Sequence, residues 1–202
     1  MWGGGLIEYD DKQGYMKAYT DPDEEMEVVL FKNQGLVHII VSGVSWNHET
    51  KMVWASTYFG LSGYDGRNWH NYLTKDSGLA SDFINSTKTR RNEVWACTDK
   101  GLSMLDFDTN TWVSYWPNKQ NGRGVIALTW PDGKKDKLES ATTLAHNYIL
   151  GMDFQQEDIW VATALGLSHG IREPQKENHL YANVSNARST ANVAPSHSQK
   201  GN

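Results

Sequence analysis

A ten-residue segment recurs three times in this chain, and the spacing of its copies limits the folds that the sequence can adopt. The copies are VWASTYFGLS from Val53, VWACTDKGLS from Val94 and IWVATALGLS from Ile159. Their shared pattern is an apolar residue followed by Trp-x-x-Thr-x-x-Gly-Leu-Ser. Self-similarity along a chain is the signature of repeat architectures, in which each unit buries its faces against its neighbours. The chain is therefore expected to fold as a series of similar units.

Each repeat unit is about 41 residues long and contains four short runs with strand character. Trp54 and Trp95 lie 41 residues apart, whereas Trp95 and Trp160 lie 65 residues apart, which indicates an insertion in the second interval. Turn-forming residues separate the runs, which in the clearest unit are residues 83–87, 93–98, 101–106 and 111–115. Four strands in about 40 residues are typical of a β-propeller blade.

The composition also favours an all-β fold. The 202 residues include nine Trp, nine Tyr and eighteen Gly, which suit aromatic β-type packing with many turns better than a helical bundle. A chain of this length can bury a core without a disulfide scaffold, and its one cysteine, Cys97, is interpreted as a small buried residue. The predicted fold class is all-β, a β-propeller of about four four-stranded blades.

Two segments carry a more specific pattern, GLASDFINSTKTRRNEVWACTDKGLSMLD and, before it, VWASTYFGLSGYD. This pattern resembles the repeat of the two-component regulator propeller family, most closely over residues 36–116 and more loosely over 147–168 and 2–19. The resemblance implies a propeller of about seven blades or more, of the kind found in periplasmic sensors of bacterial hybrid histidine kinases. It also implies a periplasmic or extracellular location. The kinase parts that usually follow do not occur in this sequence, so a signalling role is not expected.

Incomplete repeats at both ends leave open how the blades close. Three good copies and an N-terminal fragment are marked by Gly-Leu pairs at Gly5, Gly60, Gly101 and Gly166. The two ends could share one blade and close a ring, or the chain could be a partial propeller that another chain completes. An open series would expose an edge strand and an apolar blade face. Blades are expected over residues 1–173 and an irregular tail over 174–202.

The insertion, at about residues 117–146, is expected to overhang the central opening of the propeller. The connection from an outermost strand to the next innermost strand lies on the same rim as the Thr-x-x-Gly hairpins. Within the insertion, TWPDGKKDKL predicts a β-turn. The segment is locally basic through Arg123, Lys134 and Lys135. It is interpreted either as a solvated hairpin or as a docking arm for a partner or an anionic ligand.

Further candidate binding residues occupy the variable letters of the repeated segment. In each Thr-x-x-Gly hairpin the two middle residues differ between copies, and a repeat scaffold gains specificity by varying residues at a fixed geometry. An aromatic pair in such a place can stack on a sugar or cap an apolar partner surface. The candidates at this rim are Tyr58, Phe59, Asp99 and Lys100.

The sequence lacks the motifs of the common catalytic and metal sites. It has no His-x-x-His, His-Glu-x-x-His or Gly-x-Ser-x-Gly pattern, no P-loop and no dinucleotide fingerprint. Asp10, Asp65 and Asp106 recur at matching positions, which indicates a turn role, because a catalytic carboxylate is needed at one site only. The net charge of −5 does not suit nucleic-acid binding, and no apolar run reaches the roughly 18 residues of a membrane span. No enzyme activity, metal or cofactor is expected.

Two functional interpretations remain. The favoured one is a non-catalytic binding or assembly module that docks on a partner protein, or on a second copy of itself, through its blade edge, insertion and tail. The alternative is a ligand-sensing propeller that binds a glycan, a small anionic ligand or another small ligand at the central mouth.

Overall fold

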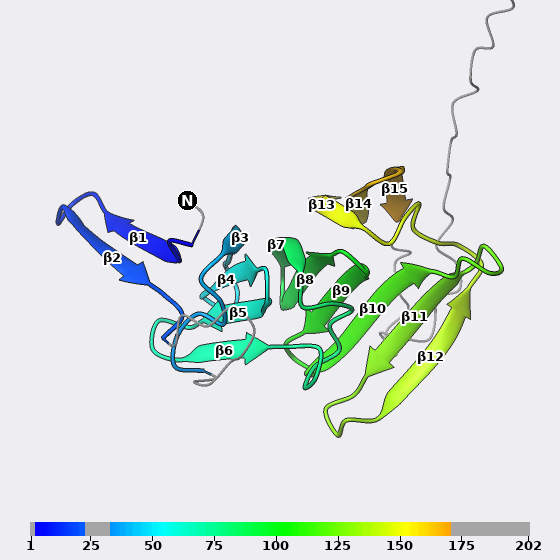
Figure 1. Ribbon diagram of the computed structural model, residues 1–202, viewed down its shortest axis with the longest axis horizontal. Coiled ribbons are helices and arrows are strands. Elements are labelled where there is room, and N and C mark those ends of the chain that lie inside the picture. Colours follow the sequence, from blue (N-terminus) through cyan, green and yellow to red (C-terminus); the bar gives the residue numbers. More distant parts are fainter. Residues whose placement is uncertain (1–2, 23–32, 171–202) are drawn as a thin grey trace, which may run out of the picture.

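The protein is all-β, as the sequence predicts. The computed structural model describes residues 3–22 and 33–170, and in those residues it contains fifteen strands and no helix. The strands form four antiparallel sheets that follow one another along the chain (Figure 1). Successive sheets pack against each other. Within each sheet, strands that follow one another in the sequence are paired, as in a simple meander.

Two of the sheets contain the four strands expected of a complete blade. The first consists of β3 (Val41–Asn47), β4 (Met52–Thr57), β5 (Gly60–Tyr64) and β6 (Trp69–Tyr72). The second begins with β7 (Ile84–Arg90), β8 (Glu93–Thr98), β9 (Gly101–Asp106) and β10 (Thr111–Pro117). The predicted strand positions of the clearest unit are thus confirmed, with β7 and β10 longer than expected by a few residues.

The two terminal sheets are incomplete. The N-terminal sheet consists of β1 (Leu6–Asp10) and β2 (Tyr15–Tyr19), and the C-terminal sheet of β13 (Ile149–Gln155), β14 (Asp158–Thr163) and β15 (Gly166–Gly170). Register identifies their strands within the repeat, because Leu6 pairs with Tyr19 as Leu102 pairs with Tyr115. The N-terminal sheet therefore holds the third and fourth strands of a unit, and the C-terminal sheet holds the first three.

The first strands of the units lie side by side, as the inner strands of a propeller do. Strand β7 contacts β3 on one side and β13 on the other. Side chains bridge these strands at equivalent positions: Ser42 donates a hydrogen bond to the carbonyl of Ile84, and Asn85 donates one to the carbonyl of Ile149. The terminal sheets lie at opposite ends of the row (Figure 1), and no strand pairing joins them within the described residues. The four sheets form an open series.

The prediction that the insertion overhangs the central opening is wrong. Its residues form β11 (Gly124–Thr129) and β12 (Lys135–Ser140), which pair onto the outer edge of β10 and extend that sheet to six strands. The predicted turn between them is present, with the Trp130 amide donating to the carbonyl of Lys134. The insertion lies at the outside because β10 offers an unpaired edge, and because Ile126 and Leu128 join the buried core beneath it. It does not overhang the centre.

The fixed letters of the repeated segment have the same role in each copy. The Thr hydroxyl donates to the carbonyl of the Gly three residues later, at 2.7 Å, 2.7 Å and 2.8 Å, and accepts from the amide two residues later. The Gly has a positive φ of 112°, 150° or 124°, which disfavours any other residue. The Thr and Gly residues concerned are Thr57–Gly60, Thr98–Gly101 and Thr163–Gly166. The pattern therefore encodes a hairpin.

The final Ser of the segment ties each unit to the chain that precedes it. Its hydroxyl accepts a hydrogen bond from a backbone amide at the start of the same unit, at 2.9–3.0 Å in all three copies. The pairs are Val37 with Ser62, Ala80 with Ser103 and Ala145 with Ser168. The loop that leads into each sheet thus pairs one of its amides with a side chain on the third strand of that sheet.

The repeated aspartates are turn residues, as expected. One oxygen of Asp10, of Asp65 and of Asp106 accepts two backbone amides from the residues two and three positions later. These hydrogen bonds hold the pKa of the Asp65 carboxyl well below its ordinary value. Each aspartate closes the turn between the third and fourth strands of its unit.

The hydrophobic core is divided into interfaces between successive sheets. We call the face of a sheet that looks toward the next sheet along the chain its downstream face, and the opposite one its upstream face. Trp54 on the downstream face of β4 shares a buried cluster with Leu105 of the next sheet. Trp95 on the downstream face of β8 shares another with Val161 of β14. A third, smaller cluster joins the N-terminal sheet to β3–β6.

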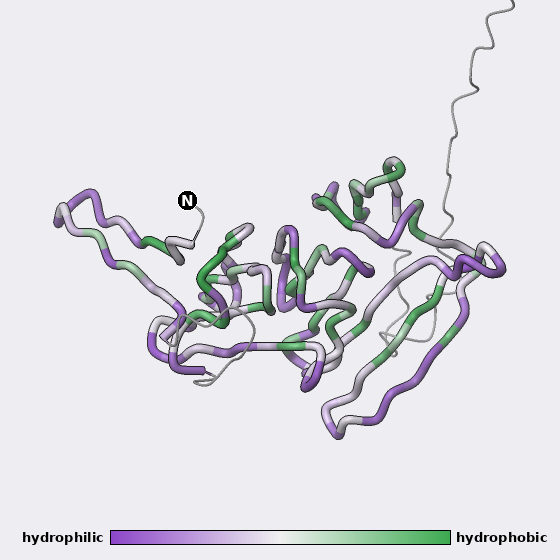
Figure 2. Tube along the Cα trace, in the orientation of Figure 1, coloured by the Kyte–Doolittle hydropathy of each residue, from purple (hydrophilic) through white to green (hydrophobic). Residues whose placement is uncertain are grey.

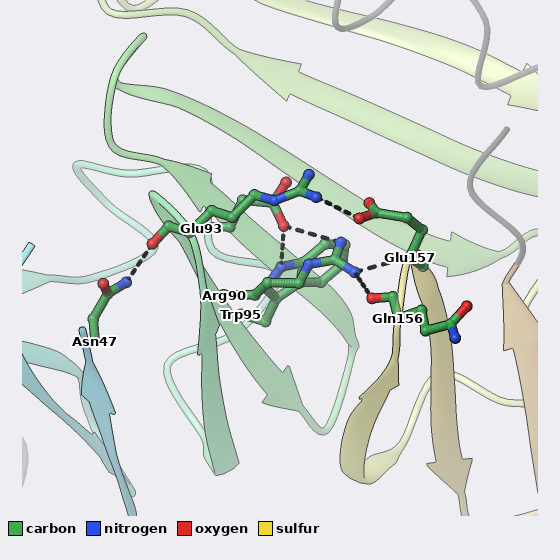
Figure 3. A network of polar contacts seen from close by, with 7 residues as sticks. Asn47, Arg90, Glu93, Trp95, Gln156 and Glu157 are labelled. Carbon is green, nitrogen blue, oxygen red and sulfur yellow. Dashed lines mark hydrogen bonds and ion pairs between the residues drawn. The ribbon is translucent and has the colours of Figure 1, made fainter. Parts of the chain in front are cut away.

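Polar contacts, which we call the latch, cross between sheets at two of the three interfaces, at the end opposite to the Thr-x-x-Gly hairpins (Figure 3). The Asn47 amide donates to the carbonyl of Arg91 at 2.8 Å, and the Arg90 guanidinium donates to the carbonyl of Gln156 at 3.2 Å. Asn47 and Arg90 both end the first strand of their units. Arg90 also pairs with Glu93, which accepts from the indole nitrogen of Trp95. The latch thus fixes the β3–β6 sheet and the β7–β12 sheet each to the first hairpin of the next sheet.

Candidate functional site

The four rim candidates lie in equivalent hairpins. Tyr58 and Phe59 follow the Thr at the end of β4, and Asp99 and Lys100 follow the Thr at the end of β8. The first residue of each pair donates its amide to the residue before the adjacent first strand, Ile40 or Phe83 at 3.1 Å and 3.3 Å. The hairpins therefore lie at the same ends of their sheets, as the sequence predicts for a shared rim.

Aromatic and acidic groups occupy this rim. The ring of Tyr58 lies 4.5 Å from that of Phe83, centroid to centroid, and so spans two successive sheets. The ring of Phe59 lies 6.4 Å from the imidazole of His38. One carboxylate oxygen of Asp99, Oδ1, is buried and has no hydrogen-bond partner among the described residues. Phe83 was not identified as a candidate from the sequence, because its pairing with Tyr58 connects two repeat units.

The three basic candidates do not form one cluster. Arg123 immediately precedes β11, which begins opposite Pro117, whereas Lys134 and Lys135 lie at the other end of that strand. All three belong to the outer part of the β7–β12 sheet and not to its inner hairpins. The structure therefore separates the basic candidates of the insertion from the aromatic and acidic candidates of the rim.

Acidic neighbours balance the basic side chains of the insertion. Arg123 lies 3.3 Å from the carboxylate of Glu139, and Lys134 lies 3.1 Å from that of Asp136. Asp136 also accepts a hydrogen bond from the indole of Trp130 at 2.7 Å. That hydrogen bond and the Lys134 ammonium hold the pKa of Asp136 below its ordinary value, so it stays ionised. This edge is a mixed-charge surface rather than a positive one.

An apolar face remains open on the C-terminal sheet. Leu61, Leu102 and Leu167 occupy one position of the repeat; the first two are 0% and 3% exposed, but Leu167 is 58% exposed. Trp160, at the position of the buried Trp54 and Trp95, is half-buried. Leu150 and Leu165 are exposed as well, so that apolar residues gather on this sheet (Figure 2). We call the surface formed by Leu150, Trp160 and Leu167 the C-terminal open face; Leu165 lies in the β14–β15 hairpin at its edge.

The β15 edge of the same sheet has no strand paired to it among the described residues. In the N-terminal and the two complete sheets, a Cβ added to the hairpin Gly would lie within 3 Å of a carbonyl oxygen of the fourth strand, that of Tyr19, Tyr72 or Tyr115. At Gly166 nothing described lies within 4 Å. The backbone groups of β15 therefore face a place that a strand occupies in the other units.

A second open face lies at the N-terminal end. Met16 occupies the position of Trp69 and Trp112, and it is 73% exposed whereas Trp112 is 5% exposed. Ile7 and Tyr9, on the same side of β1, are exposed too. We call the surface formed by Ile7, Tyr9 and Met16 the N-terminal open face. It is an upstream face, because Trp69 and Trp112 both pack against the preceding sheet.

Comparisons with known proteins place the chain only loosely. Neither the protein-family models nor the curated proteins gave a match. Among the described residues, no helix has the length and apolar character needed to cross a bilayer. Two similar solved structures are of the extracellular domain of BT4673 from B. thetaiotaomicron, described once as a one-component system and once as a hybrid two-component system.

The overlap with these structures is partial. The first is 16% identical with a TM-score of 0.42, and the alignment covers 94% of this chain and 27% of that one. The second is 15% identical with a TM-score of 0.40, covering 86% of this chain and 31% of that one. The chain thus spans less than a third of the length of either. An overlap this loose is reported as a similarity and carries no inference about function.

Proposed function

We propose that the chain is a non-catalytic binding or assembly module that docks on a partner protein through its C-terminal sheet. The observation that carries the proposal is the exposure of Leu167, at a position where the two complete sheets bury the same residue against a neighbour. Covering such a side chain is worth about 1.5–3 kcal/mol. The open edge of β15 adds backbone donors and acceptors that a partner strand can pair with.

Of the other parts of the chain, the tail contributes to the proposed role. The mixed-charge insertion is left out of the proposed surface, because β11 and β12 extend the preceding sheet. Residues 174–202 belong to the proposed docking region as well and lie outside the described residues. The resemblance of the repeat to periplasmic sensor propellers supports a periplasmic or extracellular location.

Site-specific photo-crosslinking in the cells that produce the protein tests the docking role. A photoreactive amino acid at Leu165, which is 73% exposed in the β14–β15 hairpin at the edge of the C-terminal open face, is expected to give a defined protein adduct. The same amino acid at Leu138, an exposed leucine of β12, serves as the matched control and is expected to give none. Absence of any protein adduct from Leu165, or equal adducts from both positions, would contradict the proposal.

A second candidate function is ligand binding at the rim. It is favoured by the Tyr58–Phe83 ring pair together with the buried, unpartnered Oδ1 of Asp99, because an aromatic platform beside a hydrogen-bond acceptor suits a sugar. Titration with a panel of neutral and anionic oligosaccharides, followed by calorimetry, tests it. Tyr58→Ala should abolish binding, whereas Trp46→Ala, at an exposed aromatic residue of the opposite hairpins, should not. No binding by any oligosaccharide, or equal loss in both variants, argues against this function.

A further inference from the structure

We infer that the partner of the C-terminal open face is the N-terminal open face of a second copy of this chain. The inference rests on the proposed docking role of the C-terminal sheet and identifies its occupant. It follows from the three interfaces that the described residues already contain, in each of which a downstream face meets an upstream face. The described residues expose one unused face of each kind, on the first sheet and on the last.

The interface between the two complete sheets shows which residues meet. On the downstream side, Trp54 and Tyr72 present their rings; on the upstream side, Phe107 and Trp112 receive them. The ring centroids lie 5.3 Å apart for Trp54 and Phe107, and 5.4 Å apart for Tyr72 and Trp112. Leu61 lies in the same buried cluster as Trp112. These pairs define the contact that a new neighbour would reproduce.

The C-terminal open face retains two residues of the downstream half, whereas Tyr72 of the fourth strand has no counterpart among the described residues. Trp160 and Leu167 stand at the positions of Trp54 and Leu61, and they are accessible. A polar residue also stands at the latch position, because Gln155 ends β13 as Arg90 ends β7. The Gln155 side-chain oxygen accepts from the indole of Trp160 at 2.9 Å, so its NH₂ group is the donor that remains for a contact with a neighbour.

The N-terminal open face keeps apolar side chains at two positions of the upstream half, whereas Asp11 takes the position of Phe107. Met16 stands at the position of Trp112, and Tyr9 at that of Leu105, both of which pack against the preceding sheet. In the N-terminal sheet no described sheet covers these side chains, which are 73% and 62% exposed. A methionine is an adaptable apolar residue, which suits a surface that must accept a neighbour without a covalent connection.

The two faces differ, so their association is head-to-tail. Such a contact leaves one free face of each kind on every pair, and copies continue to add until the rotation closes a ring. The unit of assembly is therefore expected to be larger than a simple two-fold dimer. Covering both ends would give every sheet two neighbours, which is the condition under which radial packing of blades buries both faces.

Sedimentation of the purified chain across a range of concentrations tests the inference. The wild type should associate reversibly. Leu167→Asp and Met16→Asp each place a charge in one open face and should weaken association at least about tenfold. Leu138→Asp, at a leucine of similar exposure on β12, is the matched control and should associate like the wild type. All three positions are exposed, so the charge should not disturb folding.

Mixing the two variants gives the decisive result. Leu167→Asp keeps an intact N-terminal open face and Met16→Asp keeps an intact C-terminal open face, so an equimolar mixture should form dimers although neither variant does alone. A wild type that stays monomeric, or variants that do not complement one another, would overturn the second-copy inference. The docking role would still stand if the Leu165 crosslink reached a different protein, and would fall with the inference if it reached none.

Discussion

Arg90 lies over the aromatic ring of Phe154 on the following sheet, with its guanidinium carbon 4.4 Å from the ring centroid. The same guanidinium donates to the carbonyls of Gln156 and Glu157 and pairs with the carboxylate of Glu93. A planar cation with several donors can stack and form these hydrogen bonds together, which an ammonium cannot. Arg90 is therefore a structural residue of the interface, and its positive charge is not available for a ligand.

Replacing Arg90 should destabilise the fold strongly. Arg90→Ala removes the stack and the cross-sheet hydrogen bonds, and it leaves Glu93 buried without its cation; the expected loss is about 3–5 kcal/mol of unfolding free energy. Arg91→Ala is the matched control, because Arg91 forms a more exposed ion pair with Glu157 and should cost less than about 1 kcal/mol. Urea unfolding measures both. Similar losses in the two variants would show that the latch does not hold the sheets together.

The repeated tryptophans should differ in their contribution to stability. Trp95→Ala is expected to cost about 3–5 kcal/mol, because the indole is buried between two sheets. Trp160→Ala should cost less than half as much in the isolated monomer, since its downstream side is open. Thermal and urea unfolding at a concentration where the chain is monomeric provide the comparison. An equal loss at Trp160 would mean that its open face is covered within the monomer.

Cys97 should be chemically inert in the folded protein. Burial raises the pKa of its thiol to about 11, and the side chain is fully enclosed in the interface cluster. At pH 8 the thiolate, which is the reactive form, is then scarce and inaccessible. Iodoacetamide followed by mass spectrometry should find no modification in buffer and complete modification in 8 M urea, where the label reports an unfolded chain. Rapid labelling of the native protein would contradict the assignment of Cys97 as a core residue.

His38 should make the stability of the protein depend on pH. Burial lowers its pKa below the ordinary value of 6.5, and its Nδ1 accepts the amide of Ile40, a bond that requires an unprotonated nitrogen. The unfolded chain therefore takes up a proton at higher pH than the folded one, and stability falls as the pH drops from 6.5 toward the folded-state pKa.

The variant His38→Asn separates this effect from other titrations. Its side-chain oxygen can accept the same amide but does not titrate, so the decline in unfolding free energy below pH 6.5 should become shallower. Urea unfolding at a series of pH values measures the slope in both proteins. An unchanged slope in the variant would exclude His38 as the source.

The hairpins could be predicted from the sequence because their determinants are local. Thr98 and Gly101 fix one turn through a single hydrogen bond and a positive φ, and both residues recur at the same spacing in each copy. The insertion was harder, because its place depends on a pairing with β10 that no local pattern specifies. The alternation of buried Ile126 and Leu128 with more accessible neighbours was the available signal for a strand.

The candidate sites were predicted only in part, for a related reason. The shared rim of Tyr58 and Asp99 follows from the repeat, but the contact of Tyr58 with Phe83 depends on how neighbouring sheets stack. Leu167 could not be recognised as special, because it is a leucine at the same repeat position as the buried Leu102 and differs only in that no described sheet covers it. Whether this leucine is exposed depends on the place of its sheet among the others, and the sequence of the repeat does not specify it.

The two outermost strands also differ in how they resist unwanted pairing. Strand β12 has charged residues along most of its length, Lys135, Asp136, Lys137 and Glu139, and Figure 2 colours it mainly as hydrophilic. Alternating charges of this kind discourage the recruitment of foreign strands. Strand β15 reads Gly-Leu-Ser-His-Gly and carries no Lys, Arg, Asp or Glu. If this protein forms fibrils under stress, foreign strands should therefore add at β15, residues 166–170, and not at the charged edge of β12.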